Sequence, residues 1–325
     1  MNCYIKLHDN NKLQAFVYEK VLGSSYSETT AITALAESGY IKEALYLAKE
    51  NRLFDLYLSI QIEKANAFKE AMDYIWTLSG KEAEKALIRY GKVLIDSLAH
   101  PVTELLINLS TDFRGDHHAS NPELFIHCFI DTNQELRFFL EAVTKQRDHC
   151  DPTVWNTLLE LILRDMNASA ENDNAKLVME LLTNPKACYD IEEALILLQT
   201  YECNEGLVYI YKKLQMHSLL LHLYVELRRY EDAIQLCKSR GVCEPSLWME
   251  LLTSFAKLEP VEKEEWELVI NAVELSGCFS LYEIIHTVAE NSCIPSSYCR
   301  DLARKQLERE RSITNTVLLT TRLCL

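Results

Sequence analysis

Glycine and proline are scarce in this chain, which has 8 Gly and 7 Pro among 325 residues. A fold of many short strands requires frequent turns, where these two residues are enriched. The chain also lacks an uninterrupted apolar run of about 18 residues, the length that a membrane-spanning helix requires. Hydrophobic residues still make up 48% of the chain, enough for a sizeable core. We therefore expect a soluble protein dominated by helices.

Basic residues are also in deficit, with 33 Lys and Arg against 48 Asp and Glu and a formal net charge of -15. No cluster of Lys and Arg interrupts this acidic field, so the phosphates of nucleic acid would be repelled and nucleic acid is not an expected partner. Anionic lipid would be repelled in the same way. We expect any membrane association to be indirect and peripheral, through other proteins.

Paired metal ligands are missing. The chain has 11 cysteines but no Cys-x-x-Cys, and the nearest pairs, Cys237 with Cys243 and Cys293 with Cys299, are each six residues apart. A structural zinc site needs closely spaced thiols or imidazoles. The cysteines are therefore interpreted as reduced thiols of a cytosolic protein, with no metal and no cofactor.

The remaining candidates for chemistry lack the context of an active site. Asp116-His117-His118 is interpreted as a solvated loop without a third ligand, and Gly80-Lys81 and Gly91-Lys92 lack the upstream glycine of a phosphate-binding loop. We predict no catalytic residue and no enzymatic activity.

Two groups of ring side chains are interpreted as parts of the core. His217 and His222 are five residues apart, so they do not share a helix face, and they are expected to flank a packed stripe. The stripe comprises Leu219, Leu220, Leu223 and Tyr224. Tyr209, Tyr211 and Tyr224 are spaced as core aromatics more than as a ligand cage.

A short motif recurs along the chain. The motif begins with an apolar or aromatic residue. One or two acidic residues follow shortly after it, then Ala or Gly, and then an aliphatic residue or Met. A small residue at a fixed position lets two helices approach closely, and repetition of that contact is typical of stacked helical hairpins. The motif occurs at Tyr40 to Leu45, Phe68 to Met72, Ile191 to Leu195, Cys203 to Leu207 and Tyr230 to Ile234. The sequence predicts an all-α solenoid.

Start and stop signals place individual helices. A helix is expected after Thr29 and Thr30, with Gly39 ending it before the next helix begins at Tyr40. A second hairpin is expected over residues 53 to 78. Four prolines are interpreted as helix starts, because the first turn needs no proline N–H: Pro101, Pro122, Pro152 and Pro245. Beyond Pro245, one apolar stripe comprises Leu247, Trp248, Leu251, Leu252 and Phe255.

The chain is expected to form one solenoid over residues 1 to 299, beginning with a short helix pair within residues 1 to 30. Loops are expected from Ser110 to Asn121 and from Asn167 to Asn174. Residues 300 to 312, charged with a thin apolar seam, predict the start of a coiled coil, and residues 313 to 325 form an atypical tail.

Several strings resemble the clathrin-heavy-chain-type repeat of a vacuolar protein sorting family, the eleventh of its series and a class C core component of the HOPS and CORVET tethers. They run in order over about residues 2 to 310. The most specific are Tyr57-Leu58-Ser59-Ile60-Gln61-Ile62-Glu63 and Arg89-Tyr90-Gly91-Lys92, with further matches such as Pro245-Ser246-Leu247-Trp248.

The resemblance implies a non-catalytic scaffold in vesicle tethering at late endosomes and lysosomes or vacuoles. Expected partners are other class C vacuolar protein sorting subunits and, through the complex, Rab GTPases and SNAREs. The family's β-propeller and RING domain are not found in this sequence, so ubiquitin-ligase activity, the third hypothesis, is not expected. The alternative is a free-standing helical-repeat adaptor that binds peptide segments of partner proteins.

Overall fold

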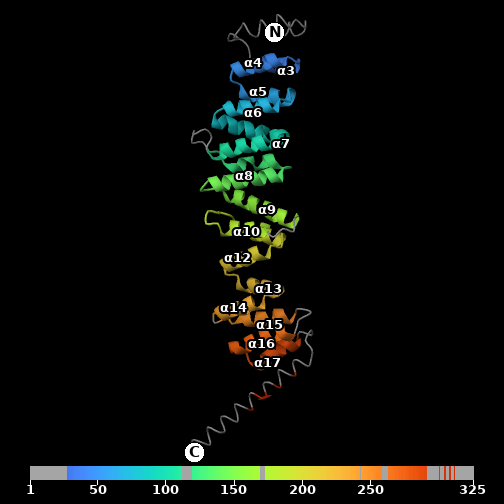
Figure 1. Cartoon of the computed structure of the whole chain (residues 1–325), viewed down its shortest axis with the longest axis vertical. Coiled ribbons are helices and arrows are strands. Elements are labelled where there is room, and N and C mark those ends of the chain that lie inside the picture. Colours follow the sequence, from blue (N-terminus) through green and yellow to red (C-terminus); the bar gives the residue numbers. More distant parts are fainter. Residues whose placement is uncertain are drawn as a thin grey trace, which may run out of the picture. The chain divides into compact units, whose positions relative to one another are not determined.

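The structure, a computed structural model, describes residues 28–111, 119–168, 173–241, 243–257 and 263–290, and the single residues 300, 304, 307, 308 and 311. These residues form helices and turns, and no strand occurs among them. The chain divides into two compact units, Met1–Leu197 and Leu198–Leu325, so the boundary falls within one helix. Within each unit the helices are layered in chain order (Figure 1).

The first unit contains helices that each pack on their neighbours in the chain. In order they are α3 (Glu28–Glu37), α4 (Ile41–Glu50), α5 (Phe54–Ser59), the π-helix η1 (Ile60–Lys64), α6 (Phe68–Thr77), α7 (Gly80–Thr111), the 3₁₀-helix η2 (Pro122–Phe129), α8 (Asn133–Gln146), α9 (Pro152–Ala168), α10 (Asp173–Thr183) and most of α11 (Ile191–Thr200). The predicted hairpins at residues 29 to 50 and 53 to 78 are confirmed.

The second unit begins at the end of α11 and follows the same plan. Its helices are α12 (Asn204–Leu214), α13 (His217–Glu226), α14 (Tyr230–Arg240), α15 (Ser246–Ala256), α16 (Lys263–Ser276) and α17 (Leu281–Glu290). Contacts between helices two apart in the chain, α13 with α15 and α15 with α17, accompany the contacts between neighbours. This pattern is that of stacked helical hairpins, so the predicted all-α solenoid fold is confirmed.

Short turns of one recurring geometry join many of these helices. Gly39, Glu202 and Gln215 each follow a helix with a positive φ, of 85°, 54° and 56°. The next backbone N–H then returns to the helix, as from Tyr40 to the Leu35 carbonyl (3.0 Å). This is a Schellman-type cap. Among these turns, the sequence signalled only the one at Gly39. Five residues other than glycine take the same left-handed conformation: Arg52, Asn66, Glu202, Gln215 and Arg228.

The prolines stand at helix starts as predicted. The long helix α7 is interrupted at Leu98, whose φ of -140° and ψ of 60° are not helical, and Pro101 lies in the first turn after that break. Pro122 begins η2 behind Asn121, whose side-chain oxygen accepts a hydrogen bond from the Glu123 N–H at 3.3 Å. Pro152 begins α9, and Pro245 directly precedes α15.

The small residues of the recurring motif lie where helices meet. Ala44, Ala71, Ala194 and Ala233 have no exposed surface, and Gly206 is buried. A Cβ added to Gly206 would lie 2.5 Å from the Leu198 Cδ2 atom of α11, so a larger residue requires that leucine to move. The prediction of close helix contacts at this motif is therefore confirmed.

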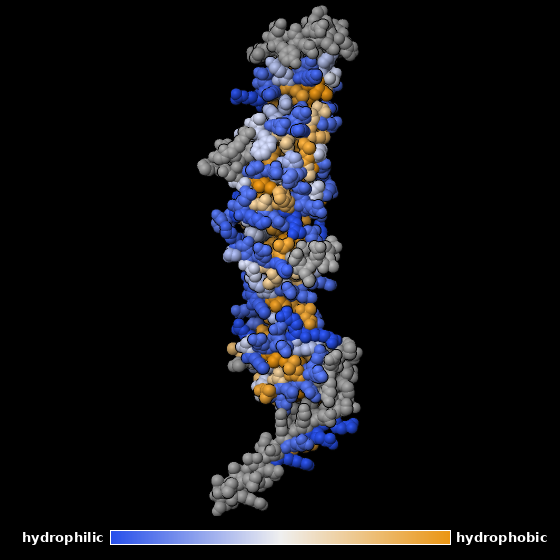
Figure 2. All heavy atoms as spheres, viewed as in Figure 1, coloured by the Kyte–Doolittle hydropathy of each residue, from blue (hydrophilic) through white to orange (hydrophobic). Residues whose placement is uncertain are grey.

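Apolar stripes fill the core between the layers. The predicted stripe of α15 is buried completely, with Leu247, Trp248, Leu251, Leu252 and Phe255 all at most 4% exposed. Burial of each such side chain contributes about 1.5–3 kcal/mol relative to exposure. Figure 2 shows hydrophilic side chains over most of the visible face, with hydrophobic ones surfacing between helices. No described helix is long and apolar enough to cross a membrane.

Both predicted loops include residues that the structure places in helices. Ser110 is buried inside α7, which extends to Thr111, because Leu109 and its neighbours continue the apolar face. The second predicted loop, Asn167 to Asn174, overlaps the end of α9 and the start of α10. The helix pair within residues 1 to 27, the coiled coil over most of residues 300 to 312 and the tail at 313 to 325 lie outside the described residues.

Candidate interaction surface

The two histidines considered as metal ligands have separate partners. His217 Nδ1 lies 3.1 Å from both carboxylate oxygens of Glu244, and His222 Nδ1 lies 2.9 Å from the Ser254 hydroxyl. One correction concerns the stripe that they flank. Leu219 is 47% exposed, while Leu220, Leu223 and Tyr224 are buried. Leu219 is outside the buried face of α13, which includes Leu220 and Leu221, and it lines the groove beside α11 and α12.

Two buried thiols have the properties of core residues. Burial raises the pKa of Cys128 to about 11 and that of Cys237 to about 12. Cys237 donates to the Leu247 carbonyl at 3.7 Å, whereas Cys243 is exposed. A thiol with so high a pKa is a poor nucleophile near neutral pH. The pair of Cys293 and Cys299 and the segment Asp116-His117-His118 lie outside the described residues.

No group of three metal-ligating side chains occurs within the part of the chain that the structure describes. The glycines of the two glycine-lysine pairs both lie in the helix α7. Gly80 begins α7, and Gly91 is buried in its middle, where an added Cβ would lie 2.7 Å from the Cys128 Sγ. A glycine at such a position allows α7 and η2 to approach closely.

Two of the three tyrosines predicted to be core residues are buried. Tyr211 and Tyr224 are 6% and 3% exposed, and Tyr209 is half-buried. The Tyr224 ring also carries cations on its faces, with Lys212 Nζ 5.8 Å and Arg229 Cζ 5.2 Å from its centroid. Such contacts contribute about 0.5–1 kcal/mol each at exposed sites.

Polar links between layers were missed by sequence reasoning. The buried Asn156 of α9 donates from Nδ2 to the Glu193 carboxylate and accepts from the Asp190 N–H at 3.2 Å. Arg137 of α8 bonds Glu141 at 2.8 Å and Asp165 of α9 at 2.6 Å. Arg137 and Glu141 are four residues apart on one helix, but the partners from different layers are 28 to 37 residues apart, so no local pattern identifies the links between layers.

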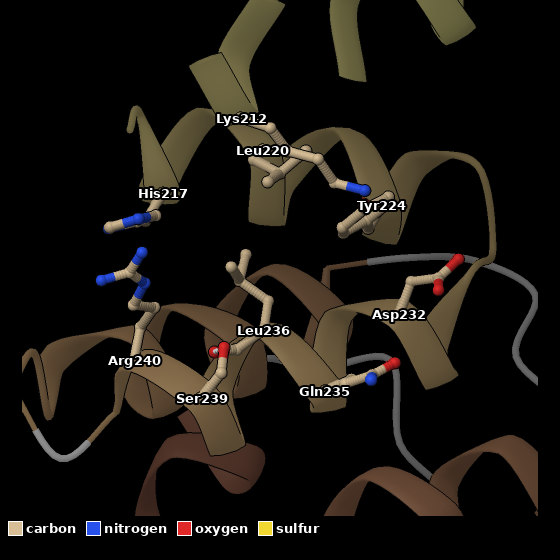
Figure 3. A pocket seen from close by; sticks show the side chains of 9 residues that line it. All are labelled: Lys212, His217, Leu220, Tyr224, Asp232, Gln235, Leu236, Ser239 and Arg240. Atoms are coloured by element: carbon tan, nitrogen blue, oxygen red, sulfur yellow. Dashed lines mark hydrogen bonds between the residues drawn. The ribbon is translucent and has the colours of Figure 1, made fainter. Parts of the chain in front are cut away.

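Grooves between adjacent helices hollow the surface of the part of the chain that the structure describes. One of about 330 Å³ lies between α8, α9 and α10, where Trp155, Leu158 and Ile162 form an apolar floor. In the second unit, a groove of about 410 Å³ lies beside α11, α12 and α13. Another, of about 380 Å³, lies between α12, α13 and α14 (Figure 3). Volumes of this size suit a few side chains of a partner.

Stacked hairpins with small residues at their contacts and grooves between their layers define an α-solenoid repeat protein. Proteins of this class bind other proteins along extended faces. Residues 1–285 match the PEP5/VPS11 clathrin repeat family, and the chain belongs to that family.

Curated relatives agree with this assignment. The chain is 32% identical over 327 residues to the human vacuolar protein sorting-associated protein 11 homolog, an alignment that covers 95% of this chain and 34% of the relative. The Dictyostelium discoideum protein of the same name is 28% identical, with 95% and 39% coverage. The Arabidopsis thaliana vacuolar protein-sorting-associated protein 11 homolog is 27% identical, with 96% and 40% coverage. The chain therefore spans about a third of the length of these relatives.

Proposed function

We propose that this chain is a non-catalytic scaffold in a tethering complex of the HOPS or CORVET type. In this role it acts in vesicle-mediated transport from endosomes to lysosomes or vacuoles, where the complex docks membranes before fusion. Its partners are other class C vacuolar protein sorting subunits, and the complex brings it to Rab GTPases and SNAREs. Its place is peripheral, on late endosomal or vacuolar membranes.

The observation that carries this proposal is the match to the PEP5/VPS11 clathrin repeat over residues 1–285. The names of these relatives assign them to vacuolar protein sorting. The fold supports a mechanical role, because layers tied by buried links such as Asn156 with Glu193 resist shear between helices. The buried, high-pKa thiols of Cys128 and Cys237 suit packing and not nucleophilic chemistry.

The test is affinity isolation from cells. The tagged chain is recovered from a membrane-free extract, and the copurifying proteins are identified by mass spectrometry, with a full-length relative isolated in parallel. We expect the other class C subunits to copurify with both. If they accompany only the full-length protein, the assembly surface lies outside these 325 residues and the scaffold proposal fails for this chain.

A second candidate is the free-standing adaptor. The grooves between α12, α13 and α14 and between α8, α9 and α10 favour it, because each presents polar groups around an apolar floor. An adaptor binds its partner as an isolated chain, whereas a tether subunit requires its fellow subunits. Binding by the purified chain in their absence therefore separates the two functions.

A further inference from the structure

The groove between α12, α13 and α14, here called the α12–α14 groove, carries positive charge at both ends. Lys212 of α12 lies at one end, with its ammonium group directed toward Tyr224 (Figure 3). Arg240 of α14 and His217 of α13 lie together at the other end. The formal net charge of the chain is -15, so this groove departs from the general acidic character of the protein.

The acids near the groove are already engaged. Asp232, the acid that lines it, accepts hydrogen bonds from Arg229 Nε at 2.7 Å and Nη2 at 2.6 Å. Glu244 lies beside His217, with 3.1 Å between its oxygens and Nδ1. Within the described ranges, no ion pair involves Lys212 or Arg240. Both cations are exposed, and each retains N–H donors for a ligand.

The middle of the groove is apolar. Leu220, 1% exposed, projects from α13, and the half-buried Leu236 projects from α14 toward it (Figure 3). Gln235 and Ser239, one turn apart on α14, provide an amide and a hydroxyl along the same wall. The groove thus has two cationic ends, an apolar centre and neutral hydrogen-bonding groups beside it.

We propose that the α12–α14 groove binds an acidic peptide segment in which carboxylates flank a central aliphatic side chain. One carboxylate bonds the Arg240 guanidinium, whose planar fork suits two oxygens, and another bonds the Lys212 ammonium. The aliphatic side chain contacts Leu220 and Leu236. Gln235 donates a hydrogen bond to a carbonyl of the peptide backbone. The Ser239 hydroxyl donates to the Leu236 carbonyl at 2.8 Å, so its oxygen accepts from a backbone N–H of the peptide.

A peptide fits this arrangement better than a small free anion. The two cations lie at opposite ends of the groove with leucines between them, so one phosphate cannot contact both (Figure 3). Burial of an aliphatic side chain in the centre also adds about 0.8 kcal/mol per CH₂ group, which an inorganic ion does not provide.

The inference goes beyond the proposed scaffold function and gives the adaptor candidate a specific class of ligand. It is tested on the purified chain without other subunits. Failure of peptide binding leaves the scaffold proposal intact, and failure of the isolation experiment leaves this groove untouched. The probe is a set of fluorescent pentapeptides with leucine at the centre and aspartate or glutamate at the other positions. Binding to the 325-residue chain is measured by fluorescence anisotropy at low and at physiological salt.

Charge reversal inside the groove is compared with the same reversal outside it. Lys212→Glu with Arg240→Glu should weaken binding at least about tenfold, which corresponds to about 1.4 kcal/mol. The matched control is Lys213→Glu with Lys238→Glu, on the same two helices but outside the groove lining. The control should retain affinity within about threefold, because neither lysine lines the groove and exposed charges outside it are screened by salt.

Three results overturn the proposal. The proposal is wrong if the wild-type protein shows no saturable binding to any of the peptides. Equal losses in the two double variants assign the binding to general electrostatics, and displacement by inorganic phosphate at concentrations similar to the peptide assigns it to a simple anion site. Circular dichroism verifies folding, and Lys212→Gln with Arg240→Gln replaces the reversal variant if that one does not fold.

Discussion

The contact between Gly91 of α7 and Cys128 of η2 predicts a change of sign in the effect of one mutation. A Cβ added to Gly91 would lie 2.7 Å from the Cys128 Sγ and 3.4 Å from its Cβ. The first distance is far inside van der Waals contact, and the second is an ordinary contact. The clash therefore depends on a single atom, the cysteine sulfur.

The magnitudes follow from two opposing effects. Forcing an extra methyl group into a packed site costs about 1–3 kcal/mol. Replacing glycine by alanine inside a helix gains about 1 kcal/mol. Gly91→Ala alone should therefore lower the free energy of unfolding by about 0–2 kcal/mol. In a Cys128→Ala background the sulfur is absent, so the same change should raise the free energy of unfolding by about 1 kcal/mol.

The assay is a double-mutant cycle on the full chain. Thermal and urea unfolding are followed by circular dichroism, and hydrogen exchange of peptides from α7 and η2 localises the effect to the first unit. The coupling free energy should be about 1–3 kcal/mol, within the range for residues in contact.

A glycine elsewhere in the same unit provides the control. Gly39 has a φ of 85° and no atom within 4 Å of an added Cβ, so Gly39→Ala should destabilise through the backbone, equally with Cys128 or Ala at position 128. If Gly91→Ala has the same effect in both backgrounds, the sulfur contact is not what requires glycine, and the reasoning is refuted.

Further predictions concern a turn, a cap and the recurring motif. Gln215→Gly should raise the free energy of unfolding by about 0.5–1 kcal/mol in urea titrations, because its φ of 56° is strained for a residue with a Cβ; a loss of stability contradicts this. Ser280 donates from its N–H (2.8 Å) and hydroxyl (2.9 Å) to the Glu283 carboxylate, which lowers the pKa of Glu283. That stabilisation is present above the ordinary glutamate pKa of about 4.3 and is lost as the pH falls through the lowered value. The Ser280 hydroxyl also accepts from the Glu283 N–H at 3.3 Å at any pH, so Ser280→Ala should increase hydrogen exchange in α17 at both pH values, and more at neutral pH than in acid. Ala71→Leu and Ala233→Leu should each cost about 1–3 kcal/mol by overpacking, and unchanged thermal midpoints for both would contradict the close-contact interpretation.

Much of the fold could be predicted from local patterns. The helix that buries Ala31 and Leu35, its end before Gly39 and the apolar stripe from Leu247 to Phe255 depend on residues within a few turns of one another. The same holds for the recurring small residue, exemplified by Ala71 and Ala233, because its position relative to the helix start is set by spacing alone. The predicted start of the first of these helices was late, because α3 begins at Glu28 and includes Thr29 and Thr30.

The errors occurred where tertiary contacts override local signals. Ser110 belongs to a predicted loop, yet packing of α7 extends the helix through it. Leu219 belongs to a predicted packed stripe, yet it is exposed, because it lines the groove beside α11 and α12 and is not part of the buried face of α13. The turns at Glu202 and Gln215 escaped notice because left-handed residues other than glycine carry no strong sequence signal.

The candidate site shows the same division. The sequence indicated, correctly, that His217 and His222 do not share a face, but it gave no sign that Lys212 and Arg240 border one groove. These two residues are 28 positions apart on different helices. Only the packing of α12, α13 and α14 brings them to the ends of one apolar floor.

Periodicity and small-residue spacing were enough to predict the helical class and the repeated hairpin, because both act over a few turns of chain. The family followed from the resemblance of specific strings such as Arg89-Tyr90-Gly91-Lys92. The tertiary structure alone decided which side chains meet between layers, such as Gly91 with Cys128 and Asn156 with Glu193. It also decided where grooves form and which charges border them. The physical reason is that such contacts join residues far apart in the chain, whose meeting depends on the packing of whole helices and not on the propensity of any segment.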